Sequence, residues 1–546
     1  MLNITVLSAF LLCTLSLIYA TTQPELTVLQ GALKGLYKKT LGNRLYSSFE
    51  GIPYAKPPQG KYRFKEPSLP RPWIGVFNAT REPSKCLQIN FIGEITGSED
   101  CLYINVYTPK LSFEAGEEKK SLDVIAFIHG GGFTAMESTF HKANILLDRD
   151  IIFVTFNYRL GALGFLSMGD DVLPGNNGLK DQALALRWIQ GNIAFFGGNP
   201  SSVTLAGISA GGACCHLHTL SPLSRGMFKG AMCMSGASLN YWAIDQSPKY
   251  RAHTVANELG CPVNDTSLMV KCLSSRPAEH IVDVTRRFWP WKLPSLSYGP
   301  VVEPAGPNAF ISDQPINILK QREALDMPLL LSFVADEGLN IGAALHGETD
   351  WLNELMDNWD EILPVLLFSA DLIPPSNRSM ISQKIKEYYN IDKSSEESLI
   401  KLIGDCMFLH KIGKLAKLQA ALNSSPVYVY RFSYRGDHSI AELFTDDDLG
   451  VSHGDDALYL TDTPLSKNFT SETDIRMSKE MVDMWVSFAA NGSLGQDWVT
   501  VGDYYPKIAF NDIEGPSTKR TIIVDDIGEE EFWDDVLAMI FHSDLN

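Results

Sequence analysis

A serine flanked by glycines, in the run Gly207-Ile208-Ser209-Ala210-Gly211, limits more than any other feature what this chain can fold into. The apolar residues 203–206 come directly before this run and predict a strand, and the small residues 212–215 follow it and can open a helix. At so sharp a turn, side chains two residues before and after the serine would collide, so glycine is needed at both places. The pattern predicts a nucleophile elbow that exposes the hydroxyl of Ser209 for covalent chemistry.

The serine motif by itself is weak evidence. With the glycine and serine content of this chain, about one chance match is expected in four such chains, and a plain turn is the alternative interpretation. A nucleophilic serine also needs a base, an acid that orients the base, and donors for the oxyanion. The rest of the chain must supply these groups at positions that the fold allows.

A second glycine-rich run, His129-Gly130-Gly131-Gly132-Phe133, hereafter the glycine loop, directly follows the apolar segment 122–128. Its three consecutive glycines leave backbone N–H groups uncovered, as an oxyanion hole requires. A chance match is rarer here, on the order of one in hundreds of chains, and a plain flexible loop is the alternative. A further donor is expected from Ala210, the residue after the serine.

The acid is expected at the end of a later strand. The apolar run 329–334 ends in Ala335-Asp336-Glu337-Gly338, and either Asp336 or Glu337 could orient a base on physical grounds. A solvated acidic turn is the alternative interpretation of this segment.

The base must be a histidine that follows the acid, because the chain order of such a fold is serine, acid, histidine. His453 is the preferred candidate, since it stands in a loop of small residues, 449–456, where glycines give the mobility that suits a proton shuttle. A surface position is the alternative for a single loop histidine. The other histidines after the acidic segment are His346, His410, His438 and His542.

Apolar segments recur along the chain and predict the strands of one sheet. Several are continuous rather than alternating, which indicates a sheet buried on both faces. Helical patterns lie between them, including the segment 179–195 and the stripe Met477, Met481, Trp485 and Phe488. This alternation predicts a mostly parallel α/β sheet. The strand candidates are residues 122–128, 151–156, 203–206, 230–234, 328–334 and 427–432.

The first 20 residues predict a secretory signal peptide, because an apolar run over residues 6–19 ends at Ala20 before polar residues. An uncleaved anchor is the alternative, although the run is short for a membrane span. No composition break divides residues 21–546, which are therefore expected to form a single domain. The net charge of −18 and the lack of a Lys/Arg-rich run argue against nucleic acid and anionic membranes as partners.

Export would permit disulfides and glycosylation. Two disulfides could each close a short loop, one between Cys86 and Cys101 and one between Cys261 and Cys272. Each would stabilise the fold by about 3 kcal/mol, although spacing alone does not fix the pairing. No Cys/His cluster has zinc-like spacing, so no metal is expected. Buried free thiols are predicted at Cys214, Cys215, Cys233 and Cys406. The glycosylation sequons are Asn78, Asn264, Asn377, Asn423, Asn468 and Asn491.

Longer motifs make the chain resemble the type-B carboxylesterases, the carboxylesterase/cholinesterase family, from about Phe49 into the C-terminal helices. The resemblance implies an α/β-hydrolase fold with a large, mostly parallel central sheet flanked by helices. It also implies a serine esterase that acts on small-molecule carboxylic esters without a cofactor. The motifs are Phe49-Glu50-Gly51-Ile52-Pro53-Tyr54-Ala55, residues 99–106, Asn157-Tyr158-Arg159-Leu160-Gly161, and Phe196-Gly197-Gly198-Asn199-Pro200 continuing through Ser209 to Gly212.

The resemblance also settles the choices that the residues leave open. It implies that Glu337 rather than Asp336 is the acid and that His453 is the base. The implied oxyanion donors are Gly131, Gly132 and Ala210. The implied disulfides are Cys86–Cys101 and Cys261–Cys272. By loose alignment, Leu296 and Tyr298 are expected to line the acyl pocket.

Within the family, the chain is most similar to secreted insect esterases, including the insecticide-resistance esterases of aphids, as in Pro290-Trp291 and residues 298–303. Two departures point away from choline esters. Residues 87–100 contain no tryptophan for a quaternary ammonium, and Ile208 stands where cholinesterases carry glutamate. Juvenile hormone esterases usually carry glutamine there, so Ile208 also counts modestly against that activity.

The expected role is therefore general ester hydrolysis that detoxifies xenobiotic esters. A hormone or pheromone esterase and a slow-turnover esterase that sequesters its ligand are the alternatives. A non-catalytic adhesion relative is disfavoured, because such relatives have lost the triad and are tethered to a membrane, whereas this chain keeps the three residues and shows no tether.

Overall fold

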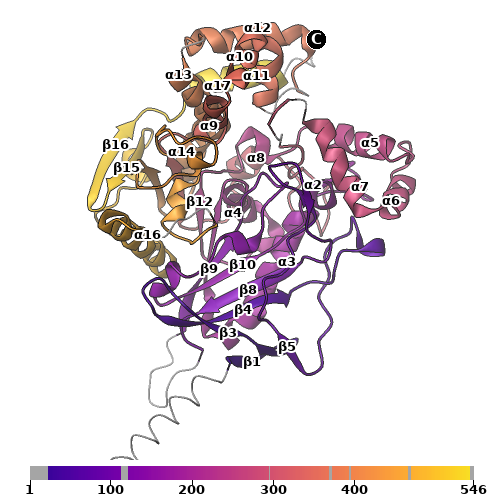
Figure 1. Cartoon of the computed structure of the whole chain (residues 1–546), viewed down its shortest axis with the longest axis vertical. Helices are drawn as coiled ribbons and strands as arrows, with labels where there is room; N and C mark the ends of the chain where they lie inside the picture. The colour runs from indigo at the N-terminus through magenta and orange to yellow at the C-terminus, as the bar shows by residue number, and fades with distance from the viewer. Residues whose placement is uncertain are drawn as a thin grey trace, which may run out of the picture.

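The computed structural model describes residues 23–111, 121–289, 291–293, 296–367, 372–392, 395–464 and 469–541. The expected signal peptide, Pro290, Asn468 and His542 lie outside these residues. A sheet of 11 strands forms the centre of the molecule (Figure 1). Its order is β16 (Thr518–Val524), β15 (Ile508–Gly515), β14 (Val427–Phe432), β13 (Leu329–Val334), β12 (Gly230–Met234), β11 (Gly198–Ile208), β9 (Leu122–Ile128), β10 (Ile151–Phe156), β8 (Tyr103–Thr108), β4 (Leu45–Pro53) and β3 (Leu36–Lys39).

The central strands, from β15 across to β10, all run parallel to one another. The six segments predicted as strands are all among them. The strand before the serine is longer than predicted and covers Gly198–Ile208 rather than residues 203–206 alone. The expected α/β-hydrolase fold, with a large sheet flanked by helices, is confirmed.

Burial on both faces explains why these strands are continuous apolar runs. Along β9, Val124 and Ile128 belong to one apolar core, whereas Ile125 and Phe127 belong to the core on the opposite face. Successive side chains of a strand point to opposite faces, so both sets must be apolar when helices cover both.

The two edges of the sheet are antiparallel, which the sequence patterns did not indicate. β16 pairs with β15 on one side, and β8, β4 and β3 form the other edge. β16 is mostly exposed, and its first four residues, Thr518–Thr521, are polar, so its apolar signal is confined to the last three residues. Two smaller sheets contain β1 (Glu25–Val28), β2 (Gly31–Lys34) and β5 (Val76–Asn78), and β6 (Gln88–Ile89) with β7 (Ile95–Thr96).

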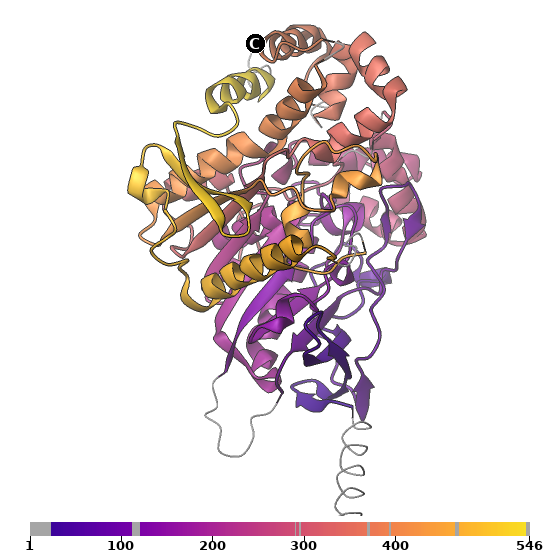
Figure 2. The same ribbon diagram turned by 60° about the vertical axis from the view of Figure 1, so that its left-hand side comes forward.

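Helices cover both faces and one end of the sheet. The predicted segment 179–195 forms α3 and a short 3-10 turn, and the Met/aromatic stripe is the buried face of α16, which crosses the sheet in Figure 2. Helices α9 to α13 and α17 gather at one end (Figure 1). The bounds are α2 Gly161–Phe165, α3 Asn177–Asn192, α4 Ala210–Leu220, α5 Pro248–Glu258, α6 Thr266–Ser274, α7 Ala278–Asp283, α8 Pro315–Lys320, α9 Leu339–Gly347, α10 Thr349–Asp357, α11 Trp359–Leu366, α12 Pro375–Tyr388, α13 Glu396–Gly404, α14 His410–Leu422, α15 Asp455–Leu458, α16 Glu472–Asn491 and α17 Glu530–Phe541.

Two disulfides join Cys86 to Cys101 and Cys261 to Cys272, as expected. The first closes the loop that carries β6 and β7, and the second ties the segment after α5 to α6. The predicted free thiols are confirmed as buried: Cys214, Cys215, Cys233 and Cys406. Within the described part of the chain, no helix is long and apolar enough to cross a membrane, and no acidic, histidine and cysteine side chains cluster as metal ligands do.

The sequons differ in exposure. Asn78, Asn264 and Asn491 are exposed, whereas Asn377 and Asn423 are half-buried. The side-chain nitrogen of Asn423, which a glycan would have to occupy, is itself buried. The three exposed asparagines are therefore the better acceptors.

Candidate active site

The predicted elbow is present between β11 and α4. β11 ends at Ile208, α4 begins at Ala210, and Ser209 lies between them at φ 57° and ψ −124°, a region that costs a residue with a side chain about 1–3 kcal/mol. A Cβ on Gly207 would lie 2.5 Å from Gly211 O, and one on Gly211 would lie 2.1 Å from Ile128 O. Both glycines are therefore required by backbone contact.

The glycine loop lies directly beside this serine. A Cβ on Gly130 would be 3.1 Å from Ser209 Cβ. Gly131 and Gly132 have φ values of 94° and 60°, which favour glycine. Ala210 is the first residue of α4, so its N–H has no acceptor within the helix and lies at the positive end of the helix dipole. The three predicted donors thus come from two segments that meet at Ser209.

Leu296 packs against the glycine loop. A Cβ on Gly132 would lie only 2.1 Å from Leu296 Cδ2, so this leucine packs onto the loop in the space that the glycine leaves. Tyr298 is buried, with its ring edge-on to Phe288 at 5.7 Å between centroids. Of the two residues expected at the acyl pocket, Leu296 therefore contacts Gly132 of the glycine loop.

Glu337 and His453 form a hydrogen-bonded pair. The His453 Nδ1–H donates to Glu337 Oε2 at 2.6 Å, while Glu337 Oε1 accepts the Val334 N–H at 3.0 Å. Glu337 is 1% exposed. Because a carboxylate only accepts hydrogen bonds, the imidazole carries its proton on Nδ1 and keeps a lone pair on Nε2, as a base requires.

Asp336, the competing acid, has a different set of partners. Its Oδ2 accepts the Val451 N–H at 2.9 Å, and its own N–H donates to Val451 O at 3.1 Å. A Cβ on Gly450 would collide with the same carboxylate. Asp336 therefore ties the segment after β13 to the loop of His453, and does not contact the imidazole.

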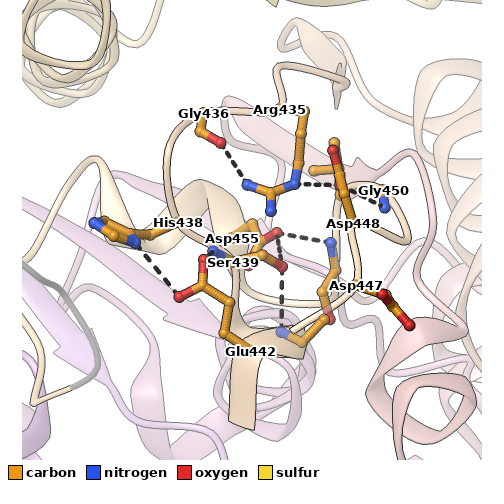
Figure 3. Close-up of polar contacts among 12 residues, drawn as sticks. Arg435, Gly436, His438, Ser439, Glu442, Asp447, Asp448, Gly450 and Asp455 are labelled. Carbon is orange, nitrogen blue, oxygen red and sulfur yellow. Dashed lines mark hydrogen bonds and ion pairs between the residues drawn. The ribbon is translucent and has the colours of Figure 1, made fainter. Parts of the chain in front are cut away.

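The histidine loop, residues 449–456, is anchored more tightly than its glycines indicated. The buried carboxylate of Asp455 accepts hydrogen bonds from Ser439 Oγ at 2.7 Å, the Ile440 N–H at 2.7 Å and the Ser452 N–H at 2.8 Å (Figure 3). At Gly454, φ is 91°, and a Cβ there would lie 3.3 Å from Ile208 Cδ1. The loop is thus packed against the residue that precedes Ser209.

The other candidate histidines have partners elsewhere. His346 lies between Glu396 and Asp447, at 2.7 Å and 2.8 Å. His410 is buried, with Nδ1 2.7 Å from Asp405 O, and His438 lies 3.4 Å from Glu442. Among the described histidines, only His453 has its imidazole paired with the glutamate of the acid motif.

Sequence reasoning missed two neighbours of the pair. Phe408 stacks on the His453 ring, with centroids 4.5 Å apart. Asp456 is fully buried and accepts hydrogen bonds from Tyr430 Oη at 3.1 Å and Ser332 Oγ at 3.3 Å. Burial, and next the charge of Glu337, raise the pKa of Asp456 to about 7. Its position three residues after His453 was visible, but its burial was not.

The stability of the protein should depend on the proton of Asp456. Its pKa is about 7 in the folded state and near its ordinary value of 3.8 in the unfolded chain, so between these values the folded state binds the extra proton. The contribution of Asp456 to stability therefore rises as the pH falls from 8 to 5. Asp456→Asn lacks this proton, so as the pH falls from 8 to 5 the Tm of the wild type should rise by a few degrees relative to that of the variant. This is the size expected from a proton-linked free energy of about 1–3 kcal/mol.

Thermal unfolding of both proteins at pH 8, 6.5 and 5 measures this effect. Asp171→Asn, at an exposed position, serves as the control and should track the wild type at every pH. A Tm difference between wild type and Asp456→Asn that does not change with pH would contradict the assignment of the proton.

Known proteins resemble this chain over nearly its full length. The carboxylesterase family profile matches residues 22–513. Venom carboxylesterase-6 of Apis mellifera is 38% identical over 528 residues, covering 93% of this chain and 94% of the relative. Esterase FE4 of Myzus persicae is 41% identical over 501 residues, covering 89% and 86%. The crystal structure of juvenile hormone esterase from Manduca sexta, with OTFP covalently attached, superposes with a TM-score of 0.82 at 29% identity, covering 95% of this chain and 100% of that one.

Proposed function

The chain belongs to the carboxylesterase family and is a carboxylic-ester hydrolase, and from that premise we propose that it works through an acyl-enzyme on Ser209, with His453 as base and Glu337 as the acid. The observation that carries the proposal is the 2.6 Å hydrogen bond between His453 Nδ1 and Glu337. It leaves Nε2 free to accept a proton, on a loop packed against the residue before the serine.

The proposed first step forms the acyl-enzyme. His453 Nε2 takes the proton of Ser209 Oγ as this oxygen attacks the ester carbonyl carbon. The N–H groups of Gly131, Gly132 and Ala210 bind the oxyanion of the tetrahedral intermediate, and each such donor typically contributes about 10²–10³ in rate. The imidazolium then gives its proton to the departing alkoxide, and the alcohol leaves.

In the proposed second step, water is the nucleophile. His453 takes a proton from water as the water oxygen attacks the acyl carbon, and the oxyanion forms again in the same site. The intermediate collapses, the proton passes to Ser209 Oγ, and the carboxylic acid is released. Glu337 holds the imidazole in one tautomer and stabilises the imidazolium in both steps.

A fluorophosphonate probe tests this proposal directly. The adduct should map to the peptide that carries Ser209, and p-nitrophenyl acetate should turn over many times per labelled site. An adduct elsewhere would contradict the assignment of the nucleophile. A stoichiometric burst of p-nitrophenol without further turnover would favour the slow, sequestering alternative over an efficient hydrolase.

We also propose that the protein is a general esterase that detoxifies xenobiotic esters. It is secreted after removal of residues 1–20 and is glycosylated at Asn78, Asn264 and Asn491. Two disulfides support export, because such bonds persist in oxidising compartments. A hormone esterase is the second candidate, since relatives include juvenile hormone esterases, although Ile208 counts against it. Relative kcat/KM values for juvenile hormone and p-nitrophenyl butyrate would separate the two.

Truncating Leu296 should change the preference for acyl chain length. Its side chain packs onto Gly132 of the glycine loop, so Leu296→Ala would open space next to the acyl carbon. We expect the kcat/KM ratio of p-nitrophenyl hexanoate to acetate to rise about tenfold, because each methylene accommodated in an apolar pocket is worth roughly 10-fold or more. Leu223→Ala, at another half-buried leucine, should leave the ratio unchanged. An unaltered ratio in Leu296→Ala would place the acyl pocket elsewhere.

A further inference from the structure

A π-helical turn interrupts one long helix near the proposed active site. Residues Asp405–Leu409 form this turn between α13 and α14, and the His410 N–H donates to Asp405 O. Such turns are rare, because they widen the helix at a cost in hydrogen-bond geometry. Those that occur are found frequently at functional sites. Here the buried Asp405 carboxylate accepts from Tyr389 Oη at 3.0 Å and is paired with Lys401, so the turn is held in place.

Carbonyl groups of the π-helical turn bind side chains from another segment. Met407 O accepts Trp242 Nε1–H at 2.7 Å and Asn240 Nδ2–H at 2.8 Å, and Phe408 O accepts the same amide at 3.1 Å. Asn240 Oδ1 in turn accepts the Ala237 N–H at 2.7 Å. These bonds connect the turn to the segment that follows β12.

The segment after β12 and the helix that carries the turn both pack on residues of the proposed triad. A Cβ on Gly236, next to Ala237, would lie 2.0 Å from Ser209 O, so that segment is in backbone contact with the elbow. On the other side, a Cβ on Gly404 would lie 3.1 Å from Gly338 N and 3.5 Å from Glu337 Cβ. The helix that contains the π-helical turn is thus fixed relative to both the nucleophile and the acid.

Phe408 is the side chain that the turn directs at the base. Its ring is 2% exposed and stacks on His453 with centroids 4.5 Å and planes 30° apart. Glu337 holds the imidazole at one ring nitrogen, which still allows the ring to rotate about that bond. A second contact on the ring face removes this freedom, and an aromatic face also attracts the cation that forms when the base is protonated.

We infer that Phe408 is a positioning residue for the general base His453, and that the π-helical turn is the device that presents it. The inference rests on the proposed triad. Phe408 holds the imidazole plane so that Nε2 stays directed at the serine, and its π face stabilises the imidazolium of both transition states. It acts through His453 and not on the ester.

Phe408→Leu removes the aromatic face and keeps most of the packing volume. We expect kcat for p-nitrophenyl butyrate, per site titrated with fluorophosphonate, to fall about tenfold with KM little changed. The acid limb of the kcat/KM profile should move to lower pH by about half a unit, because the protonated base loses a favourable contact. Phe408→Tyr keeps the ring and should retain the wild-type limb. Phe488→Leu, a buried phenylalanine of α16, should change neither quantity.

Other outcomes would overturn the inference. Wild-type kcat and acid limb in Phe408→Leu would show that the stack has no effect, and a change confined to KM would show that Phe408 contacts the substrate. If Phe408→Leu does not fold, Trp242→Phe tests the same link by removing the donor to Met407. It should lower kcat about threefold, and an unchanged kcat would overturn the role of the turn. A wild type that takes no label at Ser209 would instead refute the proposed function.

Discussion

Ser209→Ala is expected to abolish fluorophosphonate labelling and to lower p-nitrophenyl ester turnover by about 10⁴–10⁶-fold. The alanine offers no oxygen to attack the carbonyl, so His453 and the oxyanion donors are left without a covalent route. What remains is the modest acceleration that an oxyanion site supplies to attack by water. No other proposed change removes a bond-forming atom, so no other should cost more.

The fold should survive this substitution. Alanine has the same Cβ as serine and meets the same backbone strain at φ 57°, so Tm should stay close to that of the wild type. Ser209→Gly should be equally inactive but melt higher, because glycine adopts positive φ without that strain. Ser478→Ala, a buried serine that donates to Tyr459 O, is the control that should keep full activity. Turnover above about 1% of wild type in purified Ser209→Ala would refute the proposed nucleophile.

The central sheet could be predicted because both faces of each strand are buried. In β9, Ile125 and Val124 serve opposite cores, so the apolar run needed no tertiary information to be recognised. β16 is different: Lys519 and Arg520 are exposed, and pairing with β15 places this segment at the edge of the sheet. Edge strands of this kind are specified by their neighbours and leave little trace in local periodicity.

Parts of the site were predictable for a similar reason. Backbone crowding against Gly211 O and Ile128 O requires Gly207 and Gly211, and their fixed spacing around Ser209 made the motif visible, although this pattern alone also occurs by chance. Residue physics alone could not choose between Asp336 and Glu337, which are adjacent in sequence and separate only when the histidine loop packs against them. Phe408 gave no signal at all, because its contact with His453 depends on the π-helical turn and on a partner far along the chain.

The pair of carboxylates in the acid motif offers a decisive test, since only Glu337 contacts the imidazole. Glu337→Gln is expected to lower kcat about 10⁴-fold at neutral pH, the loss typical when an amide replaces the acid of such a triad. The reason is the second hydrogen bond of Glu337: Oε1 accepts the Val334 N–H at 3.0 Å. In the glutamine variant, the amide oxygen must remain with that N–H, and the amide nitrogen must then face His453.

An amide nitrogen donates, so it would pair with a lone pair on Nδ1 and force the imidazole proton onto Nε2, where Ser209 can no longer transfer its own. The shape of the side chain is kept, so folding and Tm should change little. Asp336→Asn is the matched control: its amide oxygen can still accept the Val451 N–H, and kcat should stay within about threefold of the wild type. Stopped-flow turnover of p-nitrophenyl acetate by both variants decides the matter. Equal losses at the two positions would mean that the motif acts by anchoring the histidine loop, and that neither carboxylate sets the tautomer.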